Sequence, residues 1–190
     1  MAGWRNTPDS FGHTSRLLHW AMAIAVFGML GLGTWVHWMQ PNLSNLWLYG
    51  LHKTIGLSLL TLVLVRLVWH RISPPPAPLG APEGWEVRAA RLAHRTIYLL
   101  LLATPLSGWV ASSATGLDVM VFDTWVVPRI TPVSELWEKR GFAVHGVLTK
   151  VLAALLVVHV AAALRRARAG DGTLRRMITG SATIPNRANS

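Results

Sequence analysis

The chain has 190 residues, of which 52% are hydrophobic, with a mean hydropathy of +0.38, a formal net charge of +10 and no cysteine. A composition this apolar excludes an ordinary soluble domain. The lack of cysteine excludes disulfides, cysteine-ligated iron–sulfur clusters and a covalently attached c-type haem, so a metal or haem would have to be held by histidine, methionine or carboxylate.

Four apolar blocks are each long enough to cross a bilayer, which takes about 20 residues. Two blocks carry no charge, one carries Lys53 and Arg66 near its ends, and one is interrupted only by Lys150. We therefore predict an all-α membrane protein, a single domain over residues 1–190 that forms a bundle of four transmembrane helices. The predicted spans are about 17–39, 51–69, 94–117 and 141–164, joined by a Pro-rich loop at 72–87 and a long loop at 118–140, with a basic tail at 165–190.

Basic residues concentrate in the segments that we expect on one side of the membrane. Arginines precede the first span, lie between the second and third, and follow the fourth, whereas the other two connections are uncharged or nearly balanced. Because cytoplasmic segments carry the excess of Lys and Arg, both termini are predicted to be cytoplasmic and the 118–140 loop external. The positive charge therefore indicates membrane topology, and we expect no nucleic-acid partner.

The fourth span, FAVHGVLTKVLAALLVVHVAAAL, contains His145 and His159, although polar side chains are expensive in lipid. Their separation is about 40° short of four helical turns, so both lie on one face, about 21 Å apart along the axis. They cannot bind the same metal. This spacing suits two haems stacked along the membrane normal, one in each leaflet, each of which needs a second axial ligand.

The predicted topology sorts the remaining histidines by depth. His52 begins the second span and is level with His145, whereas His19 begins the first span and is level with His159. Depth alone leaves alternatives, because three other histidines share these levels: His37 outside, and His70 and His94 on the cytoplasmic side. His37 and His70 are less favoured because they lie in the last residues of their spans, and a six-coordinate haem sits more naturally at greater depth.

Several motifs resemble the bacterial cytochrome b561 family over roughly residues 10–180. They are LHKTIGLSLLTLVLVRLVW, AHRTIYLLLLATPLSGWVASSATG, the histidine pair of the fourth span, and GDGTLRRMITG, in the family's order. The resemblance implies a four-helix bundle in the bacterial cytoplasmic (inner) membrane that holds two non-covalent b-type haems. The family's axial-ligand positions fall on the pairs His19/His159 and His52/His145. His37 and His70 do not occupy family ligand positions.

Three further residues are candidates for contacts with haem propionates or quinone. His94 heads the third span, where it can contact a propionate, serve a quinone or proton site because imidazole titrates near neutral pH, or be only an interfacial histidine. Arg66 can pair with a propionate or extend its charged end toward the headgroups, and Lys53 can do the same at the external haem. Neither the pattern nor the family gives Lys150 a role.

Two histidine ligands leave no open iron position, which favours electron transfer over oxygen binding. We therefore predict a di-haem cytochrome that moves electrons across or within the membrane and exchanges them with quinone, such as ubiquinone. A transporter or a purely structural protein is disfavoured by the paired histidines.

Two alternatives remain open, so the sequence does not decide whether the protein is an enzyme. The family includes superoxide oxidases, which pass an electron from external superoxide to ubiquinone. That anionic substrate calls for an electropositive surface, but the external charges nearly cancel. They are Lys53, Arg129, Lys139 and Arg140 against Asp118, Asp123, Glu135 and Glu138. The other alternative is a membrane subunit that serves a separate redox partner protein, docked on the external loop.

Overall fold

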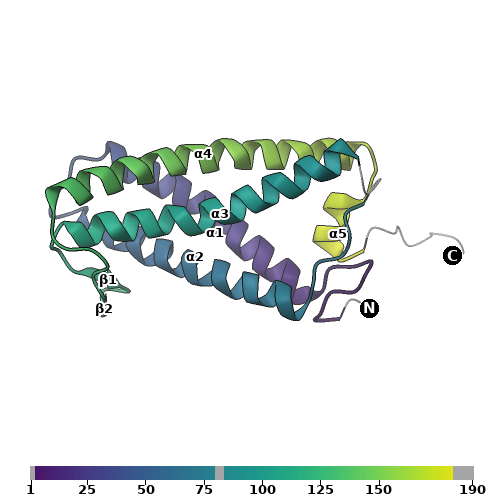
Figure 1. Ribbon diagram of the computed structural model, residues 1–190, viewed down its shortest axis with the longest axis horizontal. Coiled ribbons are helices and arrows are strands. Elements are labelled where there is room, and N and C mark those ends of the chain that lie inside the picture. Colours follow the sequence, from purple (N-terminus) through teal and green to yellow (C-terminus); the bar gives the residue numbers. More distant parts are fainter. Residues whose placement is uncertain (1–2, 80–83, 182–190) are drawn as a thin grey trace, which may run out of the picture.

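The computed structural model describes residues 3–79 and 84–181, which form four long helices, a small hairpin and a short last helix. The long helices run side by side along the long axis of the molecule (Figure 1). All four are long and apolar enough to cross a membrane. Their bounds are α1 His13–Trp38, α2 Leu46–Ile72, α3 Trp85–Ala114 and α4 Glu135–Arg168. Residues 80–83 of the Pro-rich loop and 182–190 of the basic tail lie outside the described residues.

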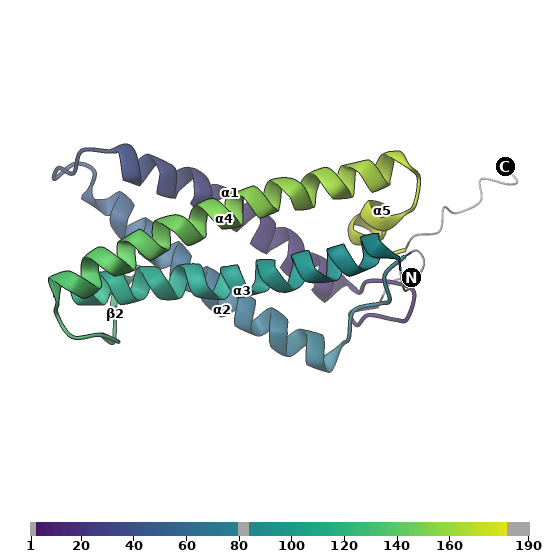
Figure 2. The ribbon, with the colours of Figure 1, turned by 45° about the horizontal axis from the view of Figure 1, so that its top comes forward.

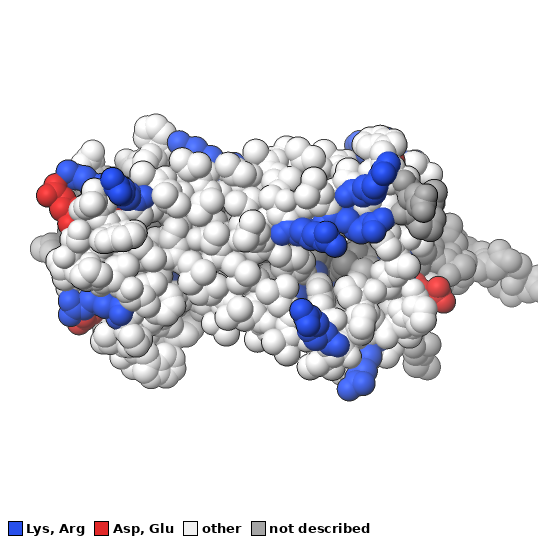
Figure 3. Space-filling view, in the orientation of Figure 1, with Lys and Arg blue, Asp and Glu red and all other residues white. Residues whose placement is uncertain are grey.

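The two ends of the bundle differ in what covers them (Figure 2). One end, which we call the terminal end, carries the first described residues and the short helix α5 (Thr173–Thr179). The other, the hairpin end, carries the strands β1 (Val119–Val121) and β2 (Trp125–Val127). On the face seen in Figure 3, Lys and Arg side chains gather mostly toward the terminal end, and much of the middle of the molecule is uncharged.

The sequence at the two ends of α4 explains where this helix begins and ends. Ser134 caps its first turn by accepting a hydrogen bond from the backbone N–H of Trp137, and Glu135 and Glu138 place negative charge beside the positive end of the helix dipole. Arginines occupy its last turn, where positive charge is favourable. Lys150 is the one Asp, Glu, Lys or Arg among the 24 positions 141–164 between the two ends.

The interior of the bundle is apolar, and every long helix contributes to it. Its buried members are Val26 of α1, Leu59 of α2, Ile97 and Leu100 of α3, and Leu152 and Leu156 of α4. Large apolar side chains also cover the outside, such as Ile24 at 73% and Val157 at 66% exposure. An apolar exterior is what lipid requires, so the histidines and the charged residues Lys53, Arg66 and Lys150 stand out within the spans.

The hairpin was not expected from the sequence. Its strands pair antiparallel, with Val121 opposite Trp125, and the turn places Phe122 and Asp123 at φ of 54° and 51°. This left-handed backbone is unfavourable for most residues other than glycine, asparagine and aspartate, so Phe122 is the unusual member of the turn. The turn is held by the backbone N–H of Phe122, which donates to the buried Thr54 hydroxyl at 3.0 Å. The hairpin is thereby fixed to α2 two residues after His52.

A network of hydrogen bonds closes the terminal end. The backbone N–H of Asn6 donates to Ser73 Oγ at 2.8 Å, and its side-chain amide donates to the Ser73 carbonyl. The guanidinium of Arg176 in α5 is buried and donates to the carbonyls of Ala77 and Pro8. The N-terminal leader, the connector after α2 and the last helix therefore form one packed cap.

Candidate functional site

Two histidines from different helices face each other near the hairpin end. His52 of α2 and His145 of α4 have ring centroids 6.1 Å apart, with the rings nearly perpendicular. Both side chains are partly buried inside the bundle. The two residues that we expected at one depth therefore also point at one another across the interior.

The hydrogen bonds of His145 prepare one of its nitrogens to bind a metal. Its Nδ1 lies 2.9 Å from the carbonyl of Thr104, with the Ser107 hydroxyl at 3.3 Å. Because a carbonyl can only accept, Nδ1 carries the ring proton and Nε2 is left with a free lone pair. An imidazole oriented in this way by a backbone carbonyl is typical of metal-binding histidines. On His52, Nδ1 is buried and has no hydrogen-bond partner in the described part of the chain.

Glycines leave room beside both rings. A Cβ atom at Gly33 of α1 would lie 3.1 Å from His52 Cε1, and one at Gly108 of α3 would lie 3.1 Å from both His145 Cε1 and Nδ1. Such distances are shorter than almost all real Cβ contacts. Any larger residue at these positions would push against a histidine, so the missing side chains keep space next to the two rings.

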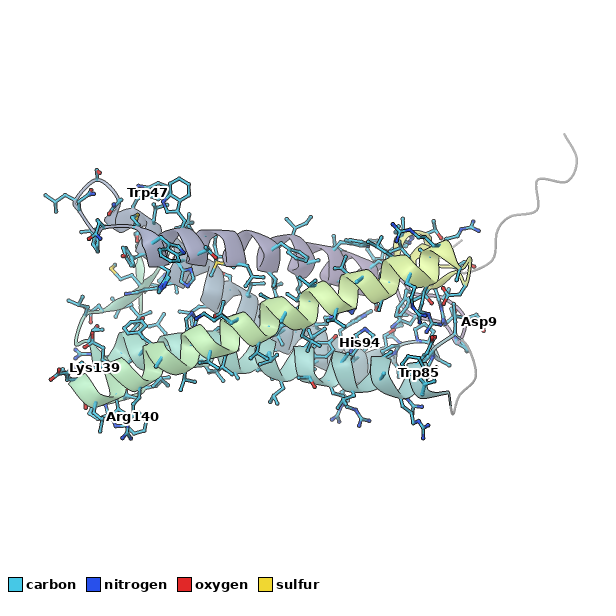
Figure 4. All side chains as sticks on the ribbon, turned by 90° about the horizontal axis from the view of Figure 1, so that it is seen from above. Asp9, Trp47, Trp85, His94, Lys139 and Arg140 are labelled. Carbon is cyan, nitrogen blue, oxygen red and sulfur yellow. The ribbon has the colours of Figure 1, made fainter. Side chains whose placement is uncertain are left out.

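A second group of histidines lies near the terminal end. The rings of His94 (α3) and His159 (α4) are 5.2 Å apart, and Figure 4 shows His94 in the half of the bundle next to that end. His19 (α1) lies in the neighbourhood of both rings. This end therefore brings together the predicted pair His19/His159 and adds a third imidazole from α3.

Arg66 reaches into this group from α2. Its Nη2 lies 3.3 Å from His19 Nδ1, and its Nε is buried without a partner among the described residues. A guanidinium only donates, so this contact leaves the His19 ring proton on Nε2. Iron ligation through Nε2 would require Arg66 to move away, and an anionic group such as a propionate would attract it.

Among the described residues, the other candidates make no hydrogen bond or ring contact with the two histidine pairs. His70 contacts the ring of Tyr98 with centroids 5.8 Å apart, and the Arg66 guanidinium lies over that same ring. His37 is exposed and its ring contact is with the adjacent Trp38. Lys53 is partly buried, and Lys150 is exposed on the outside of α4.

The residues of both pairs fit a haem, which brings four ring nitrogens of its own and needs only two from the protein. Among the described residues no group of three or more His, Cys, Asp or Glu could hold a bare metal ion. At the hairpin end the fit rests on the orphaned His52 Nδ1, the oriented His145 and the space kept by Gly33 and Gly108. At the terminal end it rests on the buried, unpaired Nε of Arg66 beside His19, which offers a cation to a propionate.

Sequence reasoning missed the residues that shape these sites rather than those that carry the imidazoles. Gly33 was not singled out, and Thr104, Ser107 and Tyr98 were not considered. Gly108 was noted only together with Pro105, three residues earlier in the TPLSGW motif of the third span. That motif indicated a helix kink, whereas the glycine also makes room for a side chain from another helix.

Comparison with known proteins identifies the family. The sequence model of a family described as prokaryotic cytochrome b561 matches residues 10–180. The chain is 35% identical over 177 residues to cytochrome b561 homolog 2 of Escherichia coli K12, covering 91% of this chain and 93% of that protein. It is 26% identical to cytochrome b561 homolog 1 of the same organism (90% and 97% covered) and 24% identical to a probable superoxide oxidase CybB of Yersinia pestis (85% and 91% covered). The chain therefore belongs to the prokaryotic cytochrome b561 family of multi-pass membrane cytochromes, and this membership implies haem b binding and electron transfer.

Proposed function

We propose that this protein is a di-haem cytochrome that moves electrons across the bacterial inner membrane and exchanges them with quinone. His52 and His145 hold one haem at the hairpin end, and His19 and His159 hold the other at the terminal end. The observation that carries the proposal is the facing of His52 and His145 at 6.1 Å between two glycines, with His145 oriented by the Thr104 carbonyl.

Haem supplies one-electron redox chemistry in such a protein, and the chain supplies ligands, shape and charge. The carbonyl of Thr104 fixes the tautomer of His145, and Gly33 and Gly108 keep the neighbouring helices clear of both imidazoles. The apolar core between the two pairs, around Leu59 and Leu152, excludes water from the middle of the bundle. These features support electron transfer at the edges of the two centres rather than binding of a substrate at the iron.

The orientation in the membrane is part of the same proposal. The terminal end faces the cytoplasm, because basic residues gather there and cytoplasmic segments carry the excess of Lys and Arg (Figure 3). Quinone exchange belongs to this end, where His94 lies beside His159. Reducing a quinone consumes protons, and an imidazole near the membrane surface can deliver them because it titrates near neutral pH.

Superoxide oxidation at the hairpin end is the second candidate, favoured by the name of the Yersinia pestis relative. The charges around the hairpin do not favour it. The segment 118–140 has Arg129, Lys139 and Arg140 against four acidic residues, and Lys139 is paired with Glu135 at 2.6 Å. Stopped-flow mixing of the oxidised protein with superoxide distinguishes the candidates, since rapid haem reduction would support the oxidase. Reduction only by quinol or by a protein partner would support the electron-transfer role alone.

The assignment of ligands is tested by removing one histidine at a time. Purified wild-type protein should show b-type absorption bands in the reduced-minus-oxidised spectrum and contain two haems per chain. His52→Ala and His145→Ala should each lose the same haem, and His19→Ala and His159→Ala should each lose the other. Haem content by pyridine haemochrome and the position of the remaining band are the measurements.

His37→Ala is the matched control, because His37 is an exposed histidine at the hairpin end and should keep both haems. The pairing is wrong if His37→Ala loses a haem while His52→Ala keeps both. His94→Ala separates two roles at the terminal end. Loss of a haem would make His94 a ligand in place of His19, whereas retained haem with slower quinone reduction would support its proposed role.

A further inference from the structure

Lys150 lies near the middle of the membrane-spanning part of α4. It follows Arg140 by ten residues and precedes Arg165 by fifteen, and these two arginines bound the apolar stretch. At 1.5 Å per residue, Lys150 is about 15 Å from the level of Arg140. That distance is about half the thickness of the hydrocarbon core, so the lysine starts close to the middle of the bilayer.

The side chain points away from the bundle. Leu148, Leu152, Leu155 and Leu156 pack α4 into the core, and Lys150 lies about 175° around the helix from the centre of that face. It is exposed and has no hydrogen bond or ion pair with any described residue. In Figure 4, α4 lies in front of the other helices, and no other long helix covers its outer side.

This position is unusual for a charged residue. Ionisable side chains in membrane spans almost always face the interior of the protein or a water-filled cavity, and they are paired. Lysines near helix ends avoid the cost by extending to the interface, but the four-carbon stem of lysine is much shorter than the distance from Lys150 to the level of Arg140. An isolated chain therefore leaves the polar end of the Lys150 side chain in hydrocarbon without a partner.

A second copy of this chain does not offer the missing charge. The chain has eight Asp and Glu residues, and none lies in the apolar stretches 17–39, 51–69, 96–117 or 141–164. Two copies packed through α4 would bring two lysines together, and like charges repel. The anionic group at this depth must come from a different molecule.

The surface around Lys150 fits a helix. Six exposed residues alternate at spacings of four and three along the side of α4 opposite the core, and we call them the outer face: Ala143, Val147, Lys150, Ala154, Val157 and Ala161. This spacing keeps one stripe against a neighbouring helix. Alanine and valine are small enough for two helix backbones to approach closely, which drives helix association in lipid.

We propose that the outer face of α4 docks a transmembrane helix of another membrane protein, and that this helix presents an Asp or Glu carboxylate to Lys150. The carboxylate supplies the charge that the chain lacks, and the small residues allow the helices to come close enough for the two groups to meet. Neither haem content nor electron transfer is needed for this docking.

Photocrosslinking in membranes of the native host tests the docking face. Benzoylphenylalanine replaces Val147 in the outer face, with a matched control at Ile24, which is 73% exposed near the middle of α1. The Val147 probe is also placed in chains with Lys150→Leu and Lys150→Arg. The cross-linked peptides are identified by mass spectrometry.

The expected product joins Val147 to an apolar segment of a different protein that contains Asp or Glu, and the Ile24 probe does not give it. Lys150→Leu should lower the yield at least tenfold, and Lys150→Arg should retain it. The proposal is overturned if the product is a second copy of this chain, a lipid adduct alone, or a segment without an acidic residue, or if Lys150→Leu leaves the yield unchanged.

A second measurement separates docking from folding. Lys150 contacts no described residue, so purified Lys150→Leu in detergent should keep the Tm of the wild-type protein. A clearly lower Tm would mean that Lys150 has a partner within its own chain, which would also overturn the proposal.

Discussion

At the hairpin end, His52 and His145 face each other between two glycines, and no hydrogen bond joins either ring to a Lys or Arg among the described residues. At the terminal end, by contrast, Arg66 contacts His19 directly. A haem loses one positive charge when it is reduced, and a nearby fixed cation stabilises the reduced form. The two proposed haems would have the same kind of ligands but would therefore differ in midpoint potential, with the higher value at the terminal end. Such a difference would favour electron transfer from the hairpin end toward the terminal end.

The largest effect is expected when the proposed haem site at one end of the bundle is removed and the site at the other end is left intact. Gly108→Leu should abolish haem binding at the hairpin end, because even a Cβ there would lie 3.1 Å from the His145 ring. Haem content should fall by about half, measured by pyridine haemochrome, and the remaining band should be that of the terminal-end haem. Gly31→Ala is the control, since nothing lies within 4 Å of a Cβ at Gly31. Loss of both haems, or of the terminal-end haem alone, would contradict this reading of Gly108.

Substitution of Arg66 tests whether its charge makes the midpoint potentials of the two proposed haems differ. Arg66→Leu should lower the midpoint potential of the terminal-end haem by an amount that corresponds to about 2–4 kcal/mol, which is a unit charge acting over roughly 4–8 Å in a medium of effective dielectric near 20. Arg66→Lys should recover most of the shift. Spectroelectrochemical titration follows both haems in one sample. Equal shifts in both haems would refute a local effect of Arg66.

The attachment of the hairpin to α2 should have a smaller effect, which is on the stability of the protein. Thr54→Val removes the hydroxyl that accepts from the Phe122 backbone N–H while keeping the shape of the side chain. One lost hydrogen bond costs about 0.5–1.5 kcal/mol, so the Tm in detergent should fall by a few degrees. Ser58→Ala on the same helix is the comparison, because that hydroxyl bonds only the carbonyl of Thr54 one turn earlier. If Ser58→Ala lowers the Tm as much as Thr54→Val does, the hairpin is not held through Thr54.

The smallest effect is expected from Asp171 at the terminal end. Burial acts to raise the pKa of this carboxyl, but hydrogen bonds from Thr173 and Arg166 outweigh it and hold the pKa below its ordinary value of 3.8. The carboxylate therefore stabilises the docking of α5 above pH 4, and this contribution is lost as the pH falls below that value. Amide hydrogen exchange across Thr173–Thr179 between pH 6 and pH 3 should show this loss, and Asp171→Asn should remove the pH dependence. An unchanged profile in that variant would exclude Asp171 as the group that titrates.

The four helices could be predicted because the length and composition of each apolar block determine its structure in a membrane. Lipid offers no hydrogen bonds, so a long apolar block must form a helix, and the 3.6-residue period then fixes the depth and face of each histidine. The shared depth of His52 and His145 could be predicted in this way. The contact between His94 and His159 could not be predicted, because two helices that both have a histidine at one level can still turn them in different directions.

The hairpin and the cap escaped prediction for a different reason. The hairpin turn, Phe122–Asp123, adopts left-handed backbone angles without the Asn-Gly or Asp-Gly pattern that would normally indicate such a turn. Arg176 reads as one more basic residue of the tail, yet it is 4% exposed and bonded to two distant carbonyls. Long-range hydrogen bonds of this kind leave no periodic signal in the sequence.

The contacts of Arg176 also fix an order of events during synthesis. Pro8 and Ala77 leave the ribosome many residues before Arg176 does, and Asn6 can bond Ser73 as soon as α1 and α2 have paired. The leader and the connector then remain without their bridging cation until α4 is in the membrane and α5 follows it. A chain that is interrupted before residue 173 would insert its four spans but leave the carbonyls of Pro8 and Ala77 without the donor that bridges them in the finished molecule.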